Sequence, residues 1–354
     1  ALVDSASVLV GAGTAVLLAV LGVEAEAIVA GGLSAALAAT VVAVVSAPPA
    51  PPKPSRRGIS EVGSFALPVT LSSLVYSTFR NVDYAILGAR MSAADVGFYL
   101  RAHQLGVDYQ SKISQVMLRV SFPVYSRSEN LDDFRRMRVR IVRVHATVLV
   151  PLLAAFVALA PIVIPWLFGP AWEPAVVPAQ IMAVAGIGDA LVTGTGPLLV
   201  ALGRPGILLA WNVFELAVFV PMIFLLTPYG LIAVSIGVAV FSVVTVILTW
   251  ALLIRPLVGV SVRQLALEVV PGFVVGACVV GVLSAARSAL DDAGLPTVVL
   301  LGALSLLGLA VYIASLRMLF SAVWEDVVLI FRRVRGVDPA RLPEDGAETP
   351  AARA

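Results

Sequence analysis

The feature that most constrains the fold of this chain is a series of apolar runs, each about 17 to 25 residues long. A helix needs about 20 consecutive apolar residues to cross a hydrocarbon layer about 30 Å thick. The runs predict spanning helices near residues 2–21, 25–46, 63–88, 95–119, 146–168, 176–201, 206–226, 229–254, 268–286 and 296–316. Composition agrees, because 60% of the 354 residues are apolar, only 13% are charged, and the mean hydropathy is +0.99. We therefore predict an all-α polytopic membrane protein with about ten transmembrane helices.

The distribution of basic residues predicts the orientation of these helices, because Lys and Arg accumulate in cytoplasmic loops. Twelve basic residues lie in alternate loops: Lys53, Arg56, Arg57, Arg127, Arg135, Arg136, Arg138, Arg140, Arg143, Arg204, Arg255 and Arg263. The intervening loops hold only Arg90 and Arg287. This bias predicts that both ends of the chain are cytoplasmic in a bacterial inner membrane.

Several segments fall outside the spanning pattern. Residues 47–58 read APPAPPKPSRRG, a proline-rich basic stretch that cannot continue a helix and suits a linker. Residues 320–336 combine apolar residues at helical spacing with a basic cluster, which predicts an amphipathic helix on the cytoplasmic face. Residues 337–354 are polar and rich in Pro and Ala, a composition typical of a disordered tail.

Composition also excludes several kinds of site. The net charge of +2 comes from short basic clusters rather than a basic face, which argues against a nucleic-acid partner. Cys278 is the single cysteine, so the chain can build no internal disulfide, and a packing role is favoured. His103 and His145 are too few and too isolated for a metal cluster. No metal or cofactor is predicted.

Ionisable residues inside the predicted spans are the strongest functional signal, because charge at bilayer depth is costly and faces a bundle interior or a hydrated cavity. In 63–88, one helical face would carry Ser73, Tyr76, Ser77, Arg80, Asp83 and Tyr84, with Asn81 beside them. In 95–119, steps of three and four residues place six polar residues on one face: Arg101, Gln104, Asp108, Lys112, Gln115 and Arg119. Two such stripes on neighbouring helices predict a polar cavity.

The charges in these stripes permit two interpretations. Asp83 could pair locally with Arg80, and Asp108 with Lys112, at i+3 and i+4 spacing, and these pairs would only stabilise the helices. That interpretation leaves a surplus of positive charge from Arg80, Arg101, Lys112 and Arg119 against two acids. A surplus of this kind suits an anionic substrate.

Further polar residues lie in later apolar helices. Asp189 sits in AGIGDALVTGTG, whose glycines would allow close helix approach or a local break, so packing competes with a ligand or proton role. Glu215 is a second candidate for proton or cation coupling. The basic run 127–143 is interpreted mainly as a topology determinant beside anionic headgroups.

A family resemblance appears in the segment RNVDYAILGARMSAADVGFYLRAHQL at 80–105, which closely resembles the signature region of Wzx-type polysaccharide exporters of the MOP flippase superfamily. Shorter similar segments follow in the same order: FPVYSR at 122–127, LFGPAWEPA at 167–175, ALGRP at 201–205 and PYGLIAVSIGVAV at 228–240. The resemblance covers about residues 1–290. It matches Arg80, Asn81 and Asp83 to the charged family helix and Tyr99, Arg101 and His103 to the start of the next.

The resemblance implies a MOP/MATE-like transporter of two helical bundles that flips an undecaprenyl-diphosphate-linked oligosaccharide across the cytoplasmic membrane by alternating access. Residues 1–46 then correspond to the last two helices of the N-terminal bundle, and 59–319 to an eight-helix C-terminal bundle. Family members carry about four more helices before this point, so we expect a fragment, a truncation or a chain that needs a partner for the other cavity wall. Membrane lipids and polysaccharide assembly proteins are the other expected partners.

Other functions remain open at this stage. A lipid II flippase or another exporter of the superfamily would have a similar sequence, although the basic surplus disfavours cationic drugs. A truncated, non-transporting assembly subunit is a further alternative. A membrane enzyme is disfavoured, because such enzymes usually carry a large extramembrane loop and no predicted external loop here exceeds about ten residues.

Overall fold

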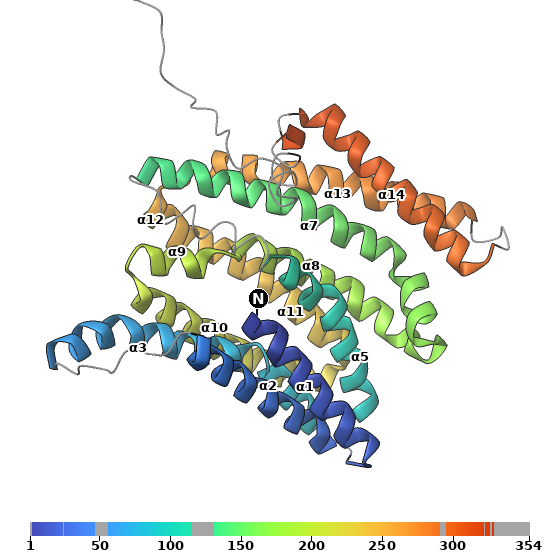
Figure 1. Cartoon of the computed structure of the whole chain (residues 1–354). Coiled ribbons are helices and arrows are strands. Elements are labelled where there is room, and N and C mark those ends of the chain that lie inside the picture. The colour runs from blue at the N-terminus through green and yellow to red at the C-terminus, as the bar shows by residue number, and fades with distance from the viewer. Residues whose placement is uncertain are drawn as a thin grey trace, which may run out of the picture. The chain divides into compact units, whose positions relative to one another are not determined.

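The computed structural model of the chain describes residues 2–23, 25–46, 56–114, 131–290, 295–321, 323–325 and 328 (Figure 1). These residues belong to two compact units, Ala1–Ser64 and Phe65–Ala354. Every element in the described ranges is a helix, which confirms the predicted all-α class.

The first unit is built on a hairpin of α1 (Leu2–Val20) and α2 (Ala25–Ser46). Small residues let the two backbones approach closely: a Cβ on Gly11 would lie 2.7 Å from Cβ of Ala35, and one on Gly31 would lie 2.8 Å from Cβ of Ala15. Such contacts are typical of helix pairs in membranes, where van der Waals packing replaces the hydrophobic effect. The outer faces expose apolar side chains, as expected for a surface in contact with lipid.

The second unit begins within α3 (Arg56–Phe79), which crosses the boundary between the units. Its remaining elements are α4 (Val82–Arg90), α5 (Ala93–His103), the π-helix η1 (Gln104–Asp108), α7 (Leu131–Phe168), η2 (Pro170–Ala175), α8 (Val176–Val192), α9 (Thr195–Ala201), α10 (Pro205–Leu226), η3 (Thr227–Tyr229), α11 (Leu231–Thr249), the π-helix η4 (Trp250–Ile254), α12 (Arg255–Val258), α13 (Val262–Leu290) and α14 (Thr297–Leu319).

Seven stretches of the described residues are long and apolar enough to cross a membrane: Glu26–Ser46, Val142–Phe168, Pro170–Ala201, Pro205–Tyr229, Leu231–Val258, Val262–Leu290 and Thr297–Leu319. The shorter helix Ser5–Val20 is also apolar. This chain is therefore a multi-pass helical membrane protein. The predicted spans 63–88 and 95–119 are not among the seven; these are the two segments that carry the polar stripes.

Two groups of helices form the interior of the second unit. In one, α13 runs alongside α7, and α14 packs against α13 (Figure 1). Gly272 makes the first contact possible, because a Cβ there would collide with the backbone of Ala146. In the other, α8 packs against η1 on one side and α11 on another. The second group positions the candidate site.

The structure corrects several predicted boundaries. The span 63–88 is interrupted at Arg80–Asn81 between α3 and α4. The span 176–201 is interrupted at Thr193–Gly194, where Gly194 has a φ of +97°, as the glycine-rich segment allowed. The helix predicted at 146–168 begins at Leu131, so this part of the basic run is helical rather than a loop.

The remaining corrections concern the segments between spans. Helix α13 begins at Val262, six residues before the prediction, and α3 begins at Arg56, inside the predicted linker. Residues 47–55 of that linker, most of the predicted amphipathic helix 320–336 and the tail 337–354 lie outside the described residues.

Candidate functional site

The break between α3 and α4 positions the central residue of the site, Arg80. The backbone N–H of Arg80 donates to O of Tyr76, and that of Asn81 donates to O of Thr78, which closes α3 with a tight turn. The Asn81 side chain donates to O of Ser77 at 2.7 Å and so satisfies a carbonyl at the helix end. The turn leaves Arg80 directed away from α3 and towards η1 and α8.

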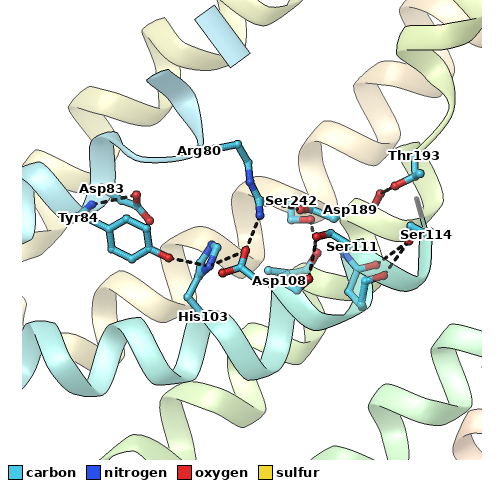
Figure 2. A network of polar contacts seen from close by, with 12 residues as sticks. Arg80, Asp83, Tyr84, His103, Asp108, Ser111, Ser114, Asp189, Thr193 and Ser242 are labelled. Atoms are coloured by element: carbon cyan, nitrogen blue, oxygen red, sulfur yellow. Dashed lines mark hydrogen bonds and ion pairs between the residues drawn. The ribbon is translucent and has the colours of Figure 1, made fainter. Parts of the chain in front are cut away.

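Arg80 joins three elements through two carboxylates (Figure 2). Its Nη2 donates to Oδ1 of Asp108 at 2.5 Å, and its Nη1 donates to Oδ2 of Asp189 at 3.2 Å. The two side-chain contacts span 28 and 109 residues of sequence. All three side chains are partly open, with exposed fractions of 22% for Arg80, 30% for Asp108 and 37% for Asp189. Solvent therefore reaches all three side chains.

A histidine and a tyrosine extend this contact. Nδ1 of His103 lies 3.5 Å from Oδ1 of Asp108 and 3.0 Å from the hydroxyl of Tyr84 (Figure 2). We call Arg80, Tyr84, His103, Asp108 and Asp189 the Arg80 cluster. His103 is buried, whereas Arg80, Asp108 and Asp189 are partly exposed.

Asp83 and Tyr99 form a separate buried pair next to the cluster. The Tyr99 hydroxyl donates to Oδ2 of Asp83 at 2.7 Å, and the backbone N–H of Tyr84 donates to Oδ1 at 2.9 Å. Asp83 is 2% exposed and Tyr99 is fully buried. Because both carboxylate oxygens are satisfied and no solvent reaches them, this pair joins α4 to α5 rather than facing a ligand.

Close backbone contact explains why η1 and α8 present their acids together. A Cβ on Gly106 would lie 2.7 Å from Met182, and one on Gly186 would collide with the carbonyl oxygen of Gly106. The π-helical turn η1 ends at Asp108, and Asp189 lies one turn beyond Gly186 on α8. Close packing of the two glycines thus sets the distance between the two acids.

The π-helix also changes the predicted polar stripe. An extra residue in one turn rotates the following residues by about 100° relative to a regular α-helix. Lys112 is accordingly exposed, with its Nζ 5.0 Å from the ring centre of Tyr109. Arg101, before the π-helix, donates to Oε1 of Gln104 at 2.9 Å and lies over the rings of Phe168 and Trp172. Asn81 is exposed.

The structure thus brings together Arg80, His103, Asp108 and Asp189 from the predicted site, with Asp83 and Tyr99 beside them. It gives Asn81, Arg101 and Lys112 other partners, and Arg119 and Gln115 lie outside the described residues. Glu215 accepts a hydrogen bond from Nε1 of Trp211 at 2.8 Å on its own helix.

The charge balance differs from the prediction. Arg80 pairs with two acids from distant elements instead of with Asp83, and Lys112 has no ion pair with Asp108 among the described contacts. Within the Arg80 cluster, one guanidinium therefore faces two carboxylates. The predicted surplus of positive charge also counted Arg101, Lys112 and Arg119, and Arg119 lies outside the described residues.

Two features of the cluster were not predicted. Tyr84 was noted on the polar stripe but was not assigned to the site, and Asp189 was predicted as a candidate for proton or cation coupling but not as a partner of Arg80. A possible signal for Asp189 was its place in a helix rich in glycines, which allow another backbone to approach closely.

The first half of the chain matches a known protein family. Residues 1–177, half of the chain, match the family model described as polysaccharide biosynthesis protein. The chain belongs to this family. The match includes Arg80, His103 and Asp108 but ends before Asp189. Membership agrees with a transporter-type biosynthesis protein and not with a catalytic enzyme.

Three curated proteins are similar to part of this chain. The lipopolysaccharide biosynthesis protein WzxC of Escherichia coli (strain K12) is 27% identical over 208 residues, which cover 58% of this chain and 42% of WzxC. An uncharacterized membrane protein in the cps region of Klebsiella pneumoniae is 25% identical over 199 residues, 55% of this chain and 41% of that protein. The teichuronic acid biosynthesis protein TuaB of Bacillus subtilis (strain 168) is 28% identical over 190 residues, 53% of this chain and 39% of TuaB.

The chain spans about two fifths of the length of the curated relatives it matches. No solved structure matches it. The family and WzxC confirm the resemblance to Wzx-type exporters that the segment at 80–105 predicted.

Proposed function

We propose that this chain is part of a transporter that moves a lipid-linked polysaccharide precursor across the cytoplasmic membrane. The precursor would be an oligosaccharide on undecaprenyl diphosphate, carried by alternating access between the two faces. Family membership supports the class of cargo. The observation that carries the proposal is the Arg80 guanidinium, which is partly exposed and pairs with two carboxylates from distant elements.

The ion pairs of Arg80 suggest how a diphosphate would bind. Each terminal nitrogen of the guanidinium meets one carboxylate oxygen, and phosphate oxygens can take the same two positions. A diphosphate would therefore have to displace Asp108 and Asp189, which leaves two carboxylates in need of a proton or a cation. Binding of substrate and binding of the coupling ion would then be linked through Arg80.

This linkage supports Asp189 as the coupling residue more strongly than Glu215. Asp189 contacts Arg80 directly, whereas Glu215 is held by Trp211 and makes no hydrogen bond or ion pair with the Arg80 cluster among the described contacts. Both remain candidates for the exchange of a proton or cation.

Predicted residues outside the cluster and outside the buried pair of Asp83 and Tyr99 would contact the sugar. Arg101 lies beside Gln104 and over the rings of Phe168 and Trp172, a combination of polar and aromatic groups that suits a saccharide. We assign Asn81, Lys112 and Arg119 to the same role, and His103 to orientation of Asp108. Both ends of the chain would face the cytoplasm, with membrane lipids and polysaccharide assembly proteins as partners.

Transport by the full-length protein in vesicles tests the proposal. Vesicles are loaded with a fluorescent undecaprenyl-diphosphate oligosaccharide, and its accessibility to a quencher on one side is followed over time. Arg80→Ala should slow flipping about 10- to 100-fold, because a charge-assisted contact contributes about 1.5–3 kcal/mol. Arg80→Lys keeps the charge but loses the paired geometry, so an intermediate rate is expected.

Arg204→Ala is the matched control, since Arg204 is exposed in a short turn and its loss removes the same charge. Normal flipping by Arg80→Ala would exclude the Arg80 cluster as the substrate site. Flipping of fluorescent lipid II in place of the oligosaccharide would identify a different cargo, and binding without flipping would identify an assembly subunit.

A further inference from the structure

A pocket outside the Arg80 cluster lies in the same unit. It opens between α7, α8, α11 and α13 and has a cavity volume of about 80 Å³. No residue of the Arg80 cluster lines it. Its wall is mainly aliphatic, with Val142, Leu191 and Val246 among the lining residues.

Two interruptions of regular helix occur at this wall. Helix α8 ends at Val192 and α9 begins at Thr195, and both residues line the pocket. Helix α11 changes to the π-helix η4 between Thr249 and Trp250, which line it as well. Irregular backbone at membrane depth persists where it is covered by protein or lines a cavity, and π-helical turns are frequent at functional sites.

Two polar groups at the pocket lack partners. Among the described residues, neither Oγ1 of Thr249 nor Nε1 of Trp250 has a hydrogen-bond partner, although both atoms are buried. The Thr249 residue is 3% exposed. A buried polar group without a partner costs free energy, so a ligand that supplies one would be bound favourably.

The charges of the pocket limit the chemistry of that ligand. Arg138 lines the wall, but its Nη1 donates to both carboxylate oxygens of Glu268, at 2.9 and 3.0 Å. The pair leaves no net charge for an anion to neutralise. The indole N–H can only donate and the hydroxyl can do either, so the ligand needs an uncharged acceptor oxygen on an apolar body.

The position along the helices agrees with a lipid. Thr249 and Trp250 come shortly before Arg255, at the end of α11 that the basic-loop bias assigns to the cytoplasm. Ester carbonyls of glycerolipids lie at this depth, between the headgroups and the hydrocarbon. We propose that this pocket binds the acyl ester portion of a membrane glycerolipid, with the ester oxygen accepting from Thr249 and Trp250.

Photolabelling tests this site independently of transport. The full-length protein in detergent is titrated with a monoacylglycerol that carries a diazirine on its acyl chain, and labelling of residues 246–254 is measured by mass spectrometry. Wild-type protein should show saturable labelling. Thr249→Val removes one neutral hydrogen bond without changing shape, so the half-saturating concentration should rise about fivefold.

Val246→Trp fills the pocket and should abolish the saturable labelling. Val244→Trp is its control, because Val244 is exposed on the same helix and does not line the pocket. Equal labelling of the two Trp variants, or a Thr249→Val titration like that of wild type, would overturn the proposal. So would stronger competition by farnesyl phosphate than by unlabelled monoacylglycerol, which would assign the pocket to an anionic prenyl lipid.

Discussion

At the scale of single residues, exposure separates two kinds of ionic contact in the second unit. The Arg138 and Glu268 side chains are 8% and 0% exposed, whereas those of Arg80, Asp108 and Asp189 are 22% to 37% exposed. A closed pair has no competitor for its hydrogen bonds and holds α7 to α13. A partly exposed pair can exchange one partner for a ligand. We therefore assign the ion pairs of Arg80 to the site and the pair of Arg138 and Glu268 to stability.

We therefore predict that Glu268→Ala lowers the free energy of unfolding by about 3–5 kcal/mol, because it leaves the Arg138 guanidinium buried without a counter-charge. The double variant Arg138→Met with Glu268→Met should recover most of this loss, since neither charge remains. Unfolding in mixed micelles of mild and denaturing detergent, followed by circular dichroism, measures both. A double variant as unstable as the single one would show that the pair does more than offset its own charges.

At the scale of elements, the site depends on interruptions of helices rather than on helices alone. The break at Arg80–Asn81, the π-helix η1 and the glycine contact between η1 and α8 together direct three charged side chains to one place. Each interruption replaces regular backbone bonds with local ones, such as the Asn81 contact with Ser77. An unbroken pair of helices would have left the same side chains paired within their own turns.

The glycine contact gives a direct prediction. Gly186→Ala should destabilise the protein by about 1–3 kcal/mol and reduce transport, because the added Cβ must push η1 and Asp108 away from α8. Gly281→Ala in α13 is the control, since a Cβ there meets nothing within 4 Å, and its effect should stay within about 1 kcal/mol. Thermal unfolding in detergent and vesicle transport are the measurements. Equal effects of the two substitutions would exclude this backbone contact as the reason for the geometry.

At the scale of the whole molecule, the chain is a multi-pass membrane protein of two units, in a family whose matched relatives are longer than this chain. The charge bias of its loops predicts an orientation of the second unit with Arg204 towards the cytoplasm and Glu173 towards the outside. The predicted orientation would also place the proposed lipid pocket in the cytoplasmic leaflet, so the two proposals share one test of topology.

Cysteine labelling checks the orientation. In a Cys278→Ala background, which removes the only thiol, Glu173→Cys should react with a membrane-impermeant maleimide in intact cells. Arg204→Cys should react only after the membrane is permeabilised. Both positions are exposed, so reactivity reports the side of the membrane rather than burial. The reverse pattern would invert the proposed topology and move the lipid pocket to the outer leaflet.

The amino-acid sequence alone was sufficient for the membrane class and for most of the later helices, because the thickness of the hydrocarbon layer sets the length of an apolar run. It also predicted Arg80 and Asp108 as cavity residues, since charge inside such a run is costly, and the family resemblance added His103. Its errors lie where helices are interrupted or extended. Arg135 and Arg138 were read as loop residues because their charge ended the apolar run, but α7 continues through them.

The partners of Arg80 could be decided only by tertiary structure. Spacing within one helix relates a residue to positions three or four away, and Asp83 was the partner of Arg80 in only one of the two interpretations that it allowed. The actual partners are 28 and 109 residues distant, and they reach Arg80 because η1 rotates Asp108 and two glycines bring α8 against it. Composition and periodicity thus determined that charge lies inside this membrane protein, while packing between distant helices determined which charges meet.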